Sequence, residues 1–302
     1  MALKQVKNKI IATKKTGQVT KAMEAVSAVK MRKSQERAFV GRPYVRSALN
    51  ILSRLSASRD GLSHPFAKVR PDGKHLLIMV TSDKGLAGSV NSAVQKKVDE
   101  IIASGENLEI LAIGRKAVEY AAREGVTLLG DYINVADGVA LSDVTSMADK
   151  VLSLYESPEY QKVSIIYQNF LSTFEQLPTL RTVLPLNPDE IKLMMEGIKP
   201  KTGKWNEVAD KDNGTATDYT VEPSSEEVLN VLIPQLVSII IYHALLESKA
   251  SEHSARMVAM KNATDKSKEM IKSLTIKYNK ARQAAITAEV SEITAGAEAM
   301  KS

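Results

Sequence analysis

The turn Gly85-Leu86-Ala87-Gly88 is the stretch of this sequence whose residue types could bind phosphate. It follows the apolar run 75–82, a predicted buried strand, and precedes a predicted helix, whose first N–H groups are a common anion site. The glycine order, however, is not Gly-x-Gly-x-x-Gly. The next predicted strand also ends in Gly114-Arg115-Lys116 and lacks a ribose-binding acid. We interpret the turn as a tight strand-to-helix connection, and an α/β enzyme with a ligand site here remains an alternative.

The sequence offers few residues for other kinds of catalytic or metal-binding chemistry. The chain has no cysteine, which excludes disulfides, thiolate metal sites and a cysteine nucleophile. Its histidines have no metal-ligand spacing, so we expect surface or packing roles for all four: His64, His75, His243 and His253. No residue set resembles a nucleophile with its base. The sequence therefore predicts no catalytic residue, no cofactor and no metal site.

Charge is distributed unevenly along the 302 residues. The net charge is +6, but residues 1–59 carry eight lysines, six arginines and two glutamates, which gives +12. Residues 225–302 carry +1, which leaves −7 for residues 60–224. A basic arm predicts an acidic partner surface, whether nucleic acid, anionic lipid or protein. A non-catalytic basic coiled-coil protein that binds nucleic acid is one alternative, although residues 21–37 lack the aromatics that stack on bases.

We find no apolar stretch long enough to span a bilayer. Residues 1–15 are basic but have no apolar core, so they do not resemble a secretory signal. Membrane association is therefore expected only through a partner.

The C-terminal region predicts one very long helix. Between Pro234 and Gly296 there is neither glycine nor proline, and about 61 residues at about 1.5 Å each would extend for about 90 Å. Compact domains rarely hold such a helix, and a heptad frame favours a coiled coil. The frame contains Met257, Met260, Thr264, Ser267, Ile271, Leu274, Tyr278, Ala281, Ala285, Ala288, Glu292, Ala295 and Ala299.

The N-terminal region predicts the partner helix. Residues 18–40 contain neither glycine nor proline, and a helical period follows apolar or small residues. The predicted seam contains Leu3, Val6, Ile10, Thr13, Val19, Met23, Val26 and Lys30. Pro43 is expected to distort the helix, and Leu49, Leu52 and Leu55 continue its apolar pattern. Because no other long helix is predicted, the two ends of the chain should pair in an antiparallel coiled coil.

The region between them alternates strands and helices. Predicted strands cover 75–82, 108–114, 126–129, 163–167 and 179–186, and predicted helices end at Ile102 or cover 115–123 and 142–155, the last with Ser142 as N-cap. This pattern predicts a mainly parallel sheet in a Rossmann-like α/β domain, inserted between the helices of a long antiparallel coiled coil. The predicted domains are 1–59, 60–224 and 225–302, with a polar insert at 196–222.

Four stretches resemble the gamma subunits of F-type ATP synthases: residues 17–33, 81–88, 252–265 and 278–297. The resemblance implies a non-catalytic rotor shaft that couples ion flow through the membrane sector to ATP synthesis or hydrolysis. It implies a coil inside a ring of three alpha and three beta subunits, with the α/β domain on the epsilon subunit and the c-subunit ring. Nucleic acid is then no partner. Contact with the membrane passes through the c ring alone, at the cytoplasmic face of a bacterial plasma membrane.

The resemblance also implies which residues contact the beta subunit. Those matching the contact with a beta-subunit loop are Arg282, Gln283, Thr287 and Glu289, and those facing its acidic lever segment are Met23, Lys30, Arg32 and Lys33. The tail 295–300 matches the tip held at the top of the ring. An acidic lever would account for the +12 arm, and a bearing would account for the small residues of the seam. Ala87 replaces a cysteine that is common in relatives, and the cysteine insert of chloroplast relatives is absent.

Overall fold

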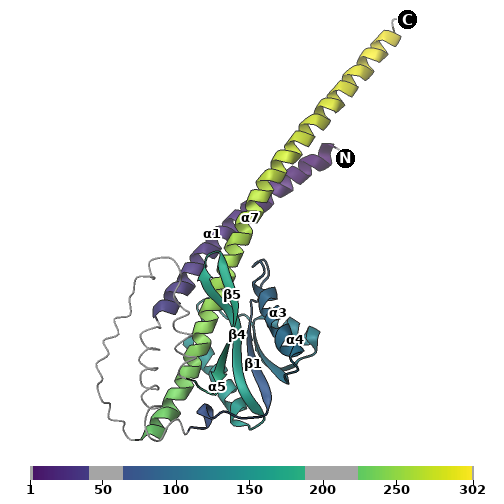
Figure 1. The fold of residues 1–302 in the computed structure, drawn as a ribbon. Coiled ribbons are helices and arrows are strands. Elements are labelled where there is room, and N and C mark those ends of the chain that lie inside the picture. Colours follow the sequence, from purple (N-terminus) through teal and green to yellow (C-terminus); the bar gives the residue numbers. More distant parts are fainter. Residues whose placement is uncertain (1–2, 41–63, 188–223, 301–302) are drawn as a thin grey trace. The chain divides into compact units, whose positions relative to one another are not determined.

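The structure, a computed structural model, describes residues 3–40, 64–187 and 224–300 (Figure 1). The chain divides into two units, and two helices, α1 (Leu3–Val40) and α7 (Ser225–Ala299), contribute to both. The coil unit consists of Met1–Val26 and Met257–Ser302, and the sheet unit of Ser27–Arg256. The long terminal helices are therefore confirmed, whereas the predicted domain boundaries stay a prediction.

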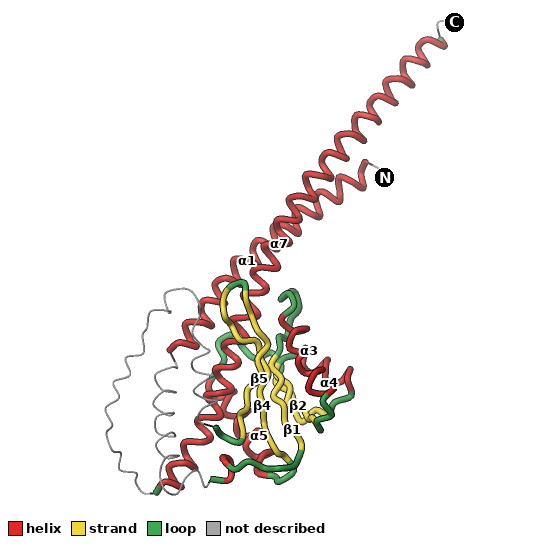
Figure 2. The backbone as a smooth tube through the Cα atoms, in the orientation of Figure 1, coloured by secondary structure: helices red, strands yellow, loops and turns green. Residues whose placement is uncertain are grey.

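The sheet unit is built on five strands in the order β3-β2-β1-β4-β5. They are β1 (Lys74–Val80), β2 (Leu108–Ile113), β3 (Thr127–Tyr132), β4 (Tyr160–Ser172) and β5 (Glu175–Leu184). β1 pairs in parallel with both β2 and β4, and β4 and β5 form an antiparallel hairpin (Figure 2). The mainly parallel sheet is confirmed. β4 is longer than predicted because its second half continues into the hairpin.

Helices cover both faces of this sheet. Residues of α3 (Val90–Ala103) and α4 (Arg115–Glu124) pack with Leu77 and Met79 of β1 on one face. Residues of α5 (Leu141–Glu156) and α7 pack with Leu76 and Ile78 on the other. Burial on both faces explains why β1 reads as a continuous apolar run. Each fully buried Leu or Ile contributes about 1.5–3 kcal/mol of transfer free energy.

The start of α5 corrects one prediction. Its N-cap is Ala140, which makes no side-chain cap hydrogen bond, and Ser142 already lies inside the helix. The connection before it forms a turn in which the Val139 N–H donates to the carbonyl of Ala136 at 3.0 Å. This turn, rather than a side-chain cap, directs the chain into the helix.

In the coil unit α1 and α7 pair antiparallel. Thr20 and Thr264 share a hydroxyl hydrogen bond of 2.7 Å, and Thr13 Oγ1 lies 3.9 Å from Met270 Sδ. A Cβ on Gly17 would lie 3.2 Å from the Cβ of Ser267, which shows close backbone approach. The predicted α7 frame is confirmed from Met257 to Ala281, because these positions are buried or half-buried.

The predicted seam of α1 is partly wrong. Val19 is 58% exposed and Val26 54% exposed, and Lys30 also faces solvent. The seam instead continues from Thr13 through Gly17 and Thr20, which keep the 3-4 spacing. The apolar pattern is misleading here because small residues, rather than large apolar ones, allow the two backbones to approach.

Three expectations fall on residues outside the described ranges. They concern the helix distortion at Pro43, the apolar set Leu49, Leu52 and Leu55, and the insert at 196–222.

The expectation that no stretch could span a bilayer is wrong by length and composition. One window of 18 residues within α7 has a mean hydropathy of 1.9 and few charges. The window is 56% buried, and α7 residues from Leu229 to Leu246 pack in the core beneath the sheet. The hydropathy of this stretch is therefore that of a core helix.

Candidate functional site

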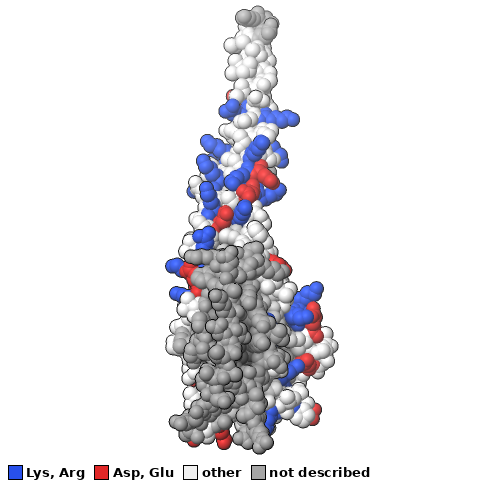
Figure 3. Space-filling model, turned by 60° about the vertical axis from the view of Figure 1, so that its left-hand side comes forward, with Lys and Arg blue, Asp and Glu red and all other residues white. Residues whose placement is uncertain are grey.

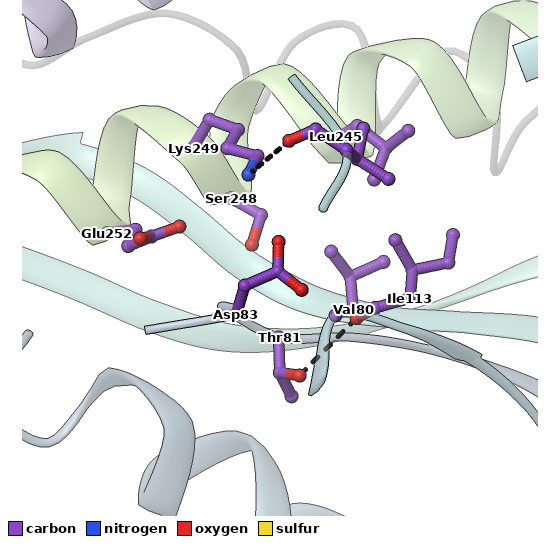
Figure 4. A pocket seen from close by; sticks show the side chains of 10 residues that line it. Val80, Thr81, Asp83, Ile113, Leu245, Ser248, Lys249 and Glu252 are labelled. Atoms are coloured by element: carbon purple, nitrogen blue, oxygen red, sulfur yellow. Dashed lines mark hydrogen bonds between the residues drawn. The ribbon is translucent and has the colours of Figure 1, made fainter. Parts of the chain in front are cut away.

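The carboxyl ends of β1 and β2 form the edge at which doubly wound sheets commonly bind ligands. Here α7 of the same sheet unit occupies that edge (Figure 4). Thr81, Asp83 and Gly114 from the strand ends face Ser248, Lys249 and Glu252 of α7 around a cavity of about 10 Å³. Such a volume holds about one water molecule. It leaves no room for a nucleotide.

The glycine-rich turn is also held by α7. The Arg256 guanidinium donates to the carbonyl oxygens of Lys84 and Gly85 at 3.5 and 3.3 Å, and to the Glu252 carboxylate at 2.6 Å. Ser82 accepts a hydrogen bond from the Asn91 side chain at 2.7 Å, which closes the turn onto α3. The turn thus connects strand to helix, as the simpler interpretation predicted. It also anchors α7, which that interpretation did not predict.

A second anchor lies on the connection between β3 and α5. The Asp137 carboxylate bonds Lys30 Nζ of α1 at 2.7 Å through Oδ2, and His253 Nε2 of α7 at 3.0 Å through Oδ1. Arg37 of α1 donates to the Asp137 carbonyl at 3.5 Å. Lys249 of α7 donates to the Val135 carbonyl at 3.0 Å, the bond drawn beside Lys249 in Figure 4. The short β3–α5 connection therefore contacts both α1 and α7.

Burial and neighbouring charges shift the pKa values of His253 and Asp137 in this second anchor. Burial lowers the pKa of His253, and the charges of Glu252 and Asp137 only partly oppose this. Nδ1 of His253 lies 3.3 Å from Arg256 Nη1, which can only donate, so Nδ1 accepts and Nε2–H donates to Asp137. Burial alone would raise the pKa of Asp137. The Lys30 and His253 contacts outweigh it and hold that pKa at about 2.

These anchors belong to a run of α7 that sequence reasoning missed. Residues 247–256 are largely polar yet mostly buried; Ser251 and Ser254 have no exposed surface. Ser251 donates to the Gln168 carbonyl of β4 at 3.0 Å, and Ser254 to the Thr173 carbonyl at 2.7 Å. The available signal was an interruption of the large apolar residues of α7 between Leu246 and Met257.

The predicted contact residues are distributed over both units. Met23 is half-buried in the seam of the coil unit, whereas the exposed Lys30, Arg32 and Lys33 belong to the sheet unit. A second group lies exposed on α7 of the coil unit: Arg282, Gln283, Thr287 and Glu289. Within it, Thr287 Oγ1 donates back to the Gln283 carbonyl at 2.9 Å.

The segment of α7 that carries the second group extends beyond the level at which α1 begins. The antiparallel register brings Leu3, where α1 begins, level with Ala281, and every described side chain from 282 to 300 is exposed. Ile286, Val290 and Ile293 are 51%, 53% and 71% exposed. Figure 3 shows basic residues along the described helices and few charges near the end of α7. Such a surface is suited to binding, not to bond-making chemistry.

No metal centre emerges from the described residues, since no group of three or more acidic or histidine side chains could hold an ion there. All four histidines are buried, and His243 and His253 lie within α7. Of the two expected roles, at the surface or in packing, they therefore have the packing role.

Comparison with known proteins decides between the remaining interpretations. The model of the ATP synthase family matches residues 2–300. The chain belongs to the family of F-type ATP synthase gamma subunits. It is accordingly a non-catalytic stalk subunit, the rotor shaft of that enzyme, and is peripheral to the membrane. The nucleic-acid alternative is left without support.

Solved structures agree with this fold. A central stalk and c-ring structure of Tetrahymena thermophila mitochondrial ATP synthase is similar at 25% identity and a TM-score of 0.58, covering 81% of this chain and 99% of that one. A structure of Euglena gracilis mitochondrial ATP synthase, containing OSCP, F1 and c-ring, has 19% identity and a TM-score of 0.66. It covers 99% of this chain and 94% of that one. A rotor structure from Euglena gracilis has 19% identity and a TM-score of 0.63, with 94% and 98% covered.

Proposed function

We propose that this chain transmits torque between a c-subunit ring and a head of three alpha and three beta subunits, with the epsilon subunit bound to its α/β domain. The free end of α7 would turn inside the head. At each angle it would favour a different conformation in each beta subunit, and such a bias is what couples rotation to ATP synthesis or hydrolysis. We also propose that the chain works at the cytoplasmic face of a bacterial plasma membrane.

One observation carries the proposal: α7 continues alone beyond its coiled-coil partner. Residues 282–297 remain helical and exposed beyond the level of the first residue of α1, over about 24 Å at about 1.5 Å per residue. An isolated helix of this length is marginal in water. Its exposed Ile286, Val290 and Ile293 therefore support a role in which a surrounding partner covers them.

The proposed contacts with the beta subunit follow from this arrangement. Arg282 and Gln283 begin the unpaired segment, so their side chains are free to engage a loop of a surrounding subunit. Thr287 and Glu289 lie one to two turns further along. Arg32 and Lys33 present exposed cations on α1 that suit an acidic lever segment, with Lys30 beside them and Met23 two turns before. Electrostatic attraction of this kind speeds association and orients the partners.

The test is the ATPase activity of matched alpha and beta subunits, assembled with and without this chain. We expect a large rise in steady turnover on adding the chain. Arg282→Ala with Gln283→Ala should weaken the rise, because the unpaired helix loses its first polar contacts. The matched control, Lys272→Ala with Ser273→Ala, likewise removes one cation and one neutral polar side chain, here from an exposed turn of the paired region.

Two outcomes would count against the proposal. If properly folded alpha and beta subunits neither bind the chain nor gain activity, the rotor role fails. If the complex forms but the 282–283 and 272–273 variants behave alike, the assignment of Arg282 and Gln283 as contacts fails.

A further inference from the structure

Asp137 of the β3–α5 connection joins two helices through separate oxygen atoms. Oδ2 bonds Lys30 of α1 and Oδ1 bonds His253 of α7, and its backbone carbonyl accepts from Arg37. Neither helix competes with the other for an acceptor. The three contacts therefore constrain α1 and α7 at once.

The surrounding backbone is shaped to present this carboxylate. Asn134 and Val139, on either side of Asp137, have positive φ angles of 58° and 34°. That conformation is costly for a β-branched residue, and it persists only where neighbouring contacts enforce it. Between them, a Cβ on Gly138 would lie 2.7 Å from Arg37 Nη1, so glycine leaves the space that the guanidinium fills.

The position of these contacts along the helices is informative. Lys30 and His253 each lie within four residues of the points where α1 and α7 leave the sheet unit, at Ser27 and Arg256. Much of the remaining α7 packing in this unit is apolar, with residues such as Leu236 and Ile240 in the core. Apolar burial is non-directional, whereas hydrogen bonds and ion pairs depend on distance and angle. The directional contacts of Asp137 thus lie near the points where each helix leaves the sheet unit.

We propose that Asp137 is a positioning residue that holds α1 and α7 at a fixed angle on the α/β domain while torque passes through the chain. The inference rests on the proposed rotor function. Torque that enters through the α/β domain must reach both helices without rotating either helix within its apolar packing. Asp137, with Lys30, Arg37 and His253, resists that turn.

Exposure separates this role from simple stabilisation. The side chains of Lys30 and Asp137 are 45% and 38% exposed, and an ion pair in contact with solvent contributes little to folding stability. The His253 side chain is only 4% exposed, but Asp137→Asn keeps an amide oxygen that can accept from it. Loss of the carboxylate should therefore reduce coupling under load more than it reduces resistance to unfolding.

The experiment uses the whole enzyme assembled in vesicles with this chain. Ions transported per ATP hydrolysed are measured against increasing opposing gradients, and urea unfolding of each chain is measured in parallel. For Asp137→Asn we expect a coupling ratio that falls as the opposing gradient grows, with little shift in the unfolding midpoint. Asp137→Glu keeps the charge and should restore much of the coupling. Asp131→Asn, on an exposed residue of β3, is the control and should behave as the wild type.

The outcomes separate the inference from the function on which it rests. If the wild-type chain supports no coupled transport, the rotor function itself fails. If the wild type couples and Asp137→Asn couples equally well at every gradient, the positioning role is overturned while the rotor function stands. A loss of coupling matched by an equal loss of stability, and not restored by Asp137→Glu, would also overturn it. Should Asp137→Asn fail to fold, Arg37→Ala removes the contact of the exposed Arg37 side chain with the Asp137 carbonyl and carries the same expectations.

Discussion

Gly114, at the end of β2, is a position where the sheet leaves no space for a side chain. A Cβ there would lie 2.2 Å from the Thr81 carbonyl oxygen, and its φ of 92° is unfavourable for any other residue. We predict that Gly114→Ala lowers the free energy of unfolding by about 3 kcal/mol or more. Gly85→Ala is the matched control, since no atom lies within 4 Å of its added Cβ. Equal urea midpoints for the two variants would contradict this.

His253 makes stability depend on pH. Burial lowers its pKa in the folded chain below the unfolded value of about 6.5, so the unfolded chain binds more protons between these two values. Its contribution to stability is therefore complete above about pH 6.5 and is lost as pH falls through the folded pKa. His75 shifts in the same direction through burial and the charge of Lys162. Asp137 stays ionised in this range because its pKa is about 2.

We accordingly predict that the urea midpoint of the wild-type chain falls between about pH 7 and about pH 5. The fall should be smaller in His253→Gln, whose amide can still donate to Asp137, and smaller again with His75→Gln added. Identical falls in the wild type and the double variant would show that these histidines do not cause the pH dependence.

At the scale of elements, the unpaired end of α7 should be the least protected helix of the isolated chain. Residues 257–281 pair with α1, whereas the side chains of residues 282–297 are all exposed. We predict amide exchange in 282–299 close to that of an unfolded peptide and strong protection in 257–274, because little opposes opening of a lone helix. Hydrogen-exchange mass spectrometry with peptides ending near Ala281 measures both. Full protection of 282–299 in the isolated chain would contradict the structure.

The same elements show what sequence reasoning could reach. The sequence predicts β1 and β2 from their continuous apolar runs and the frame of α7 from its 3-4 spacing. Burial limits the residue types at these positions. The α1 seam did not, because Gly17 and Thr20 serve close approach and carry no hydrophobic signal. The Asp137 contacts join residues 100 or more positions apart, and no local sequence pattern predicts such contacts. The assignment of the exposed Arg282 and Gln283 as contacts stays a prediction that rests on resemblance, since nothing in their local chemistry marks a contact.

For the whole molecule, the uneven charge along the chain bears on how the chain assembles with its partners. Residues 1–59 carry +12 and residues 60–224 carry −7. The described lysines of α1 that lie in the coil unit include the exposed Lys7, Lys14 and Lys21. If an acidic surface of the head receives this helix, these charges should guide assembly before close contacts form.

We therefore predict that Lys7→Gln, Lys14→Gln and Lys21→Gln together slow assembly with alpha and beta subunits about tenfold at low salt. The effect should vanish near 1 M salt, where the Debye length is about 3 Å. The control replaces three exposed lysines of the sheet unit, Lys68, Lys96 and Lys150, and so makes the same change in net charge. Stopped-flow assembly at graded salt separates the two variants. If both slow equally, net charge alone steers the chain; if only the α1 variant slows, the acidic partner surface receives this helix.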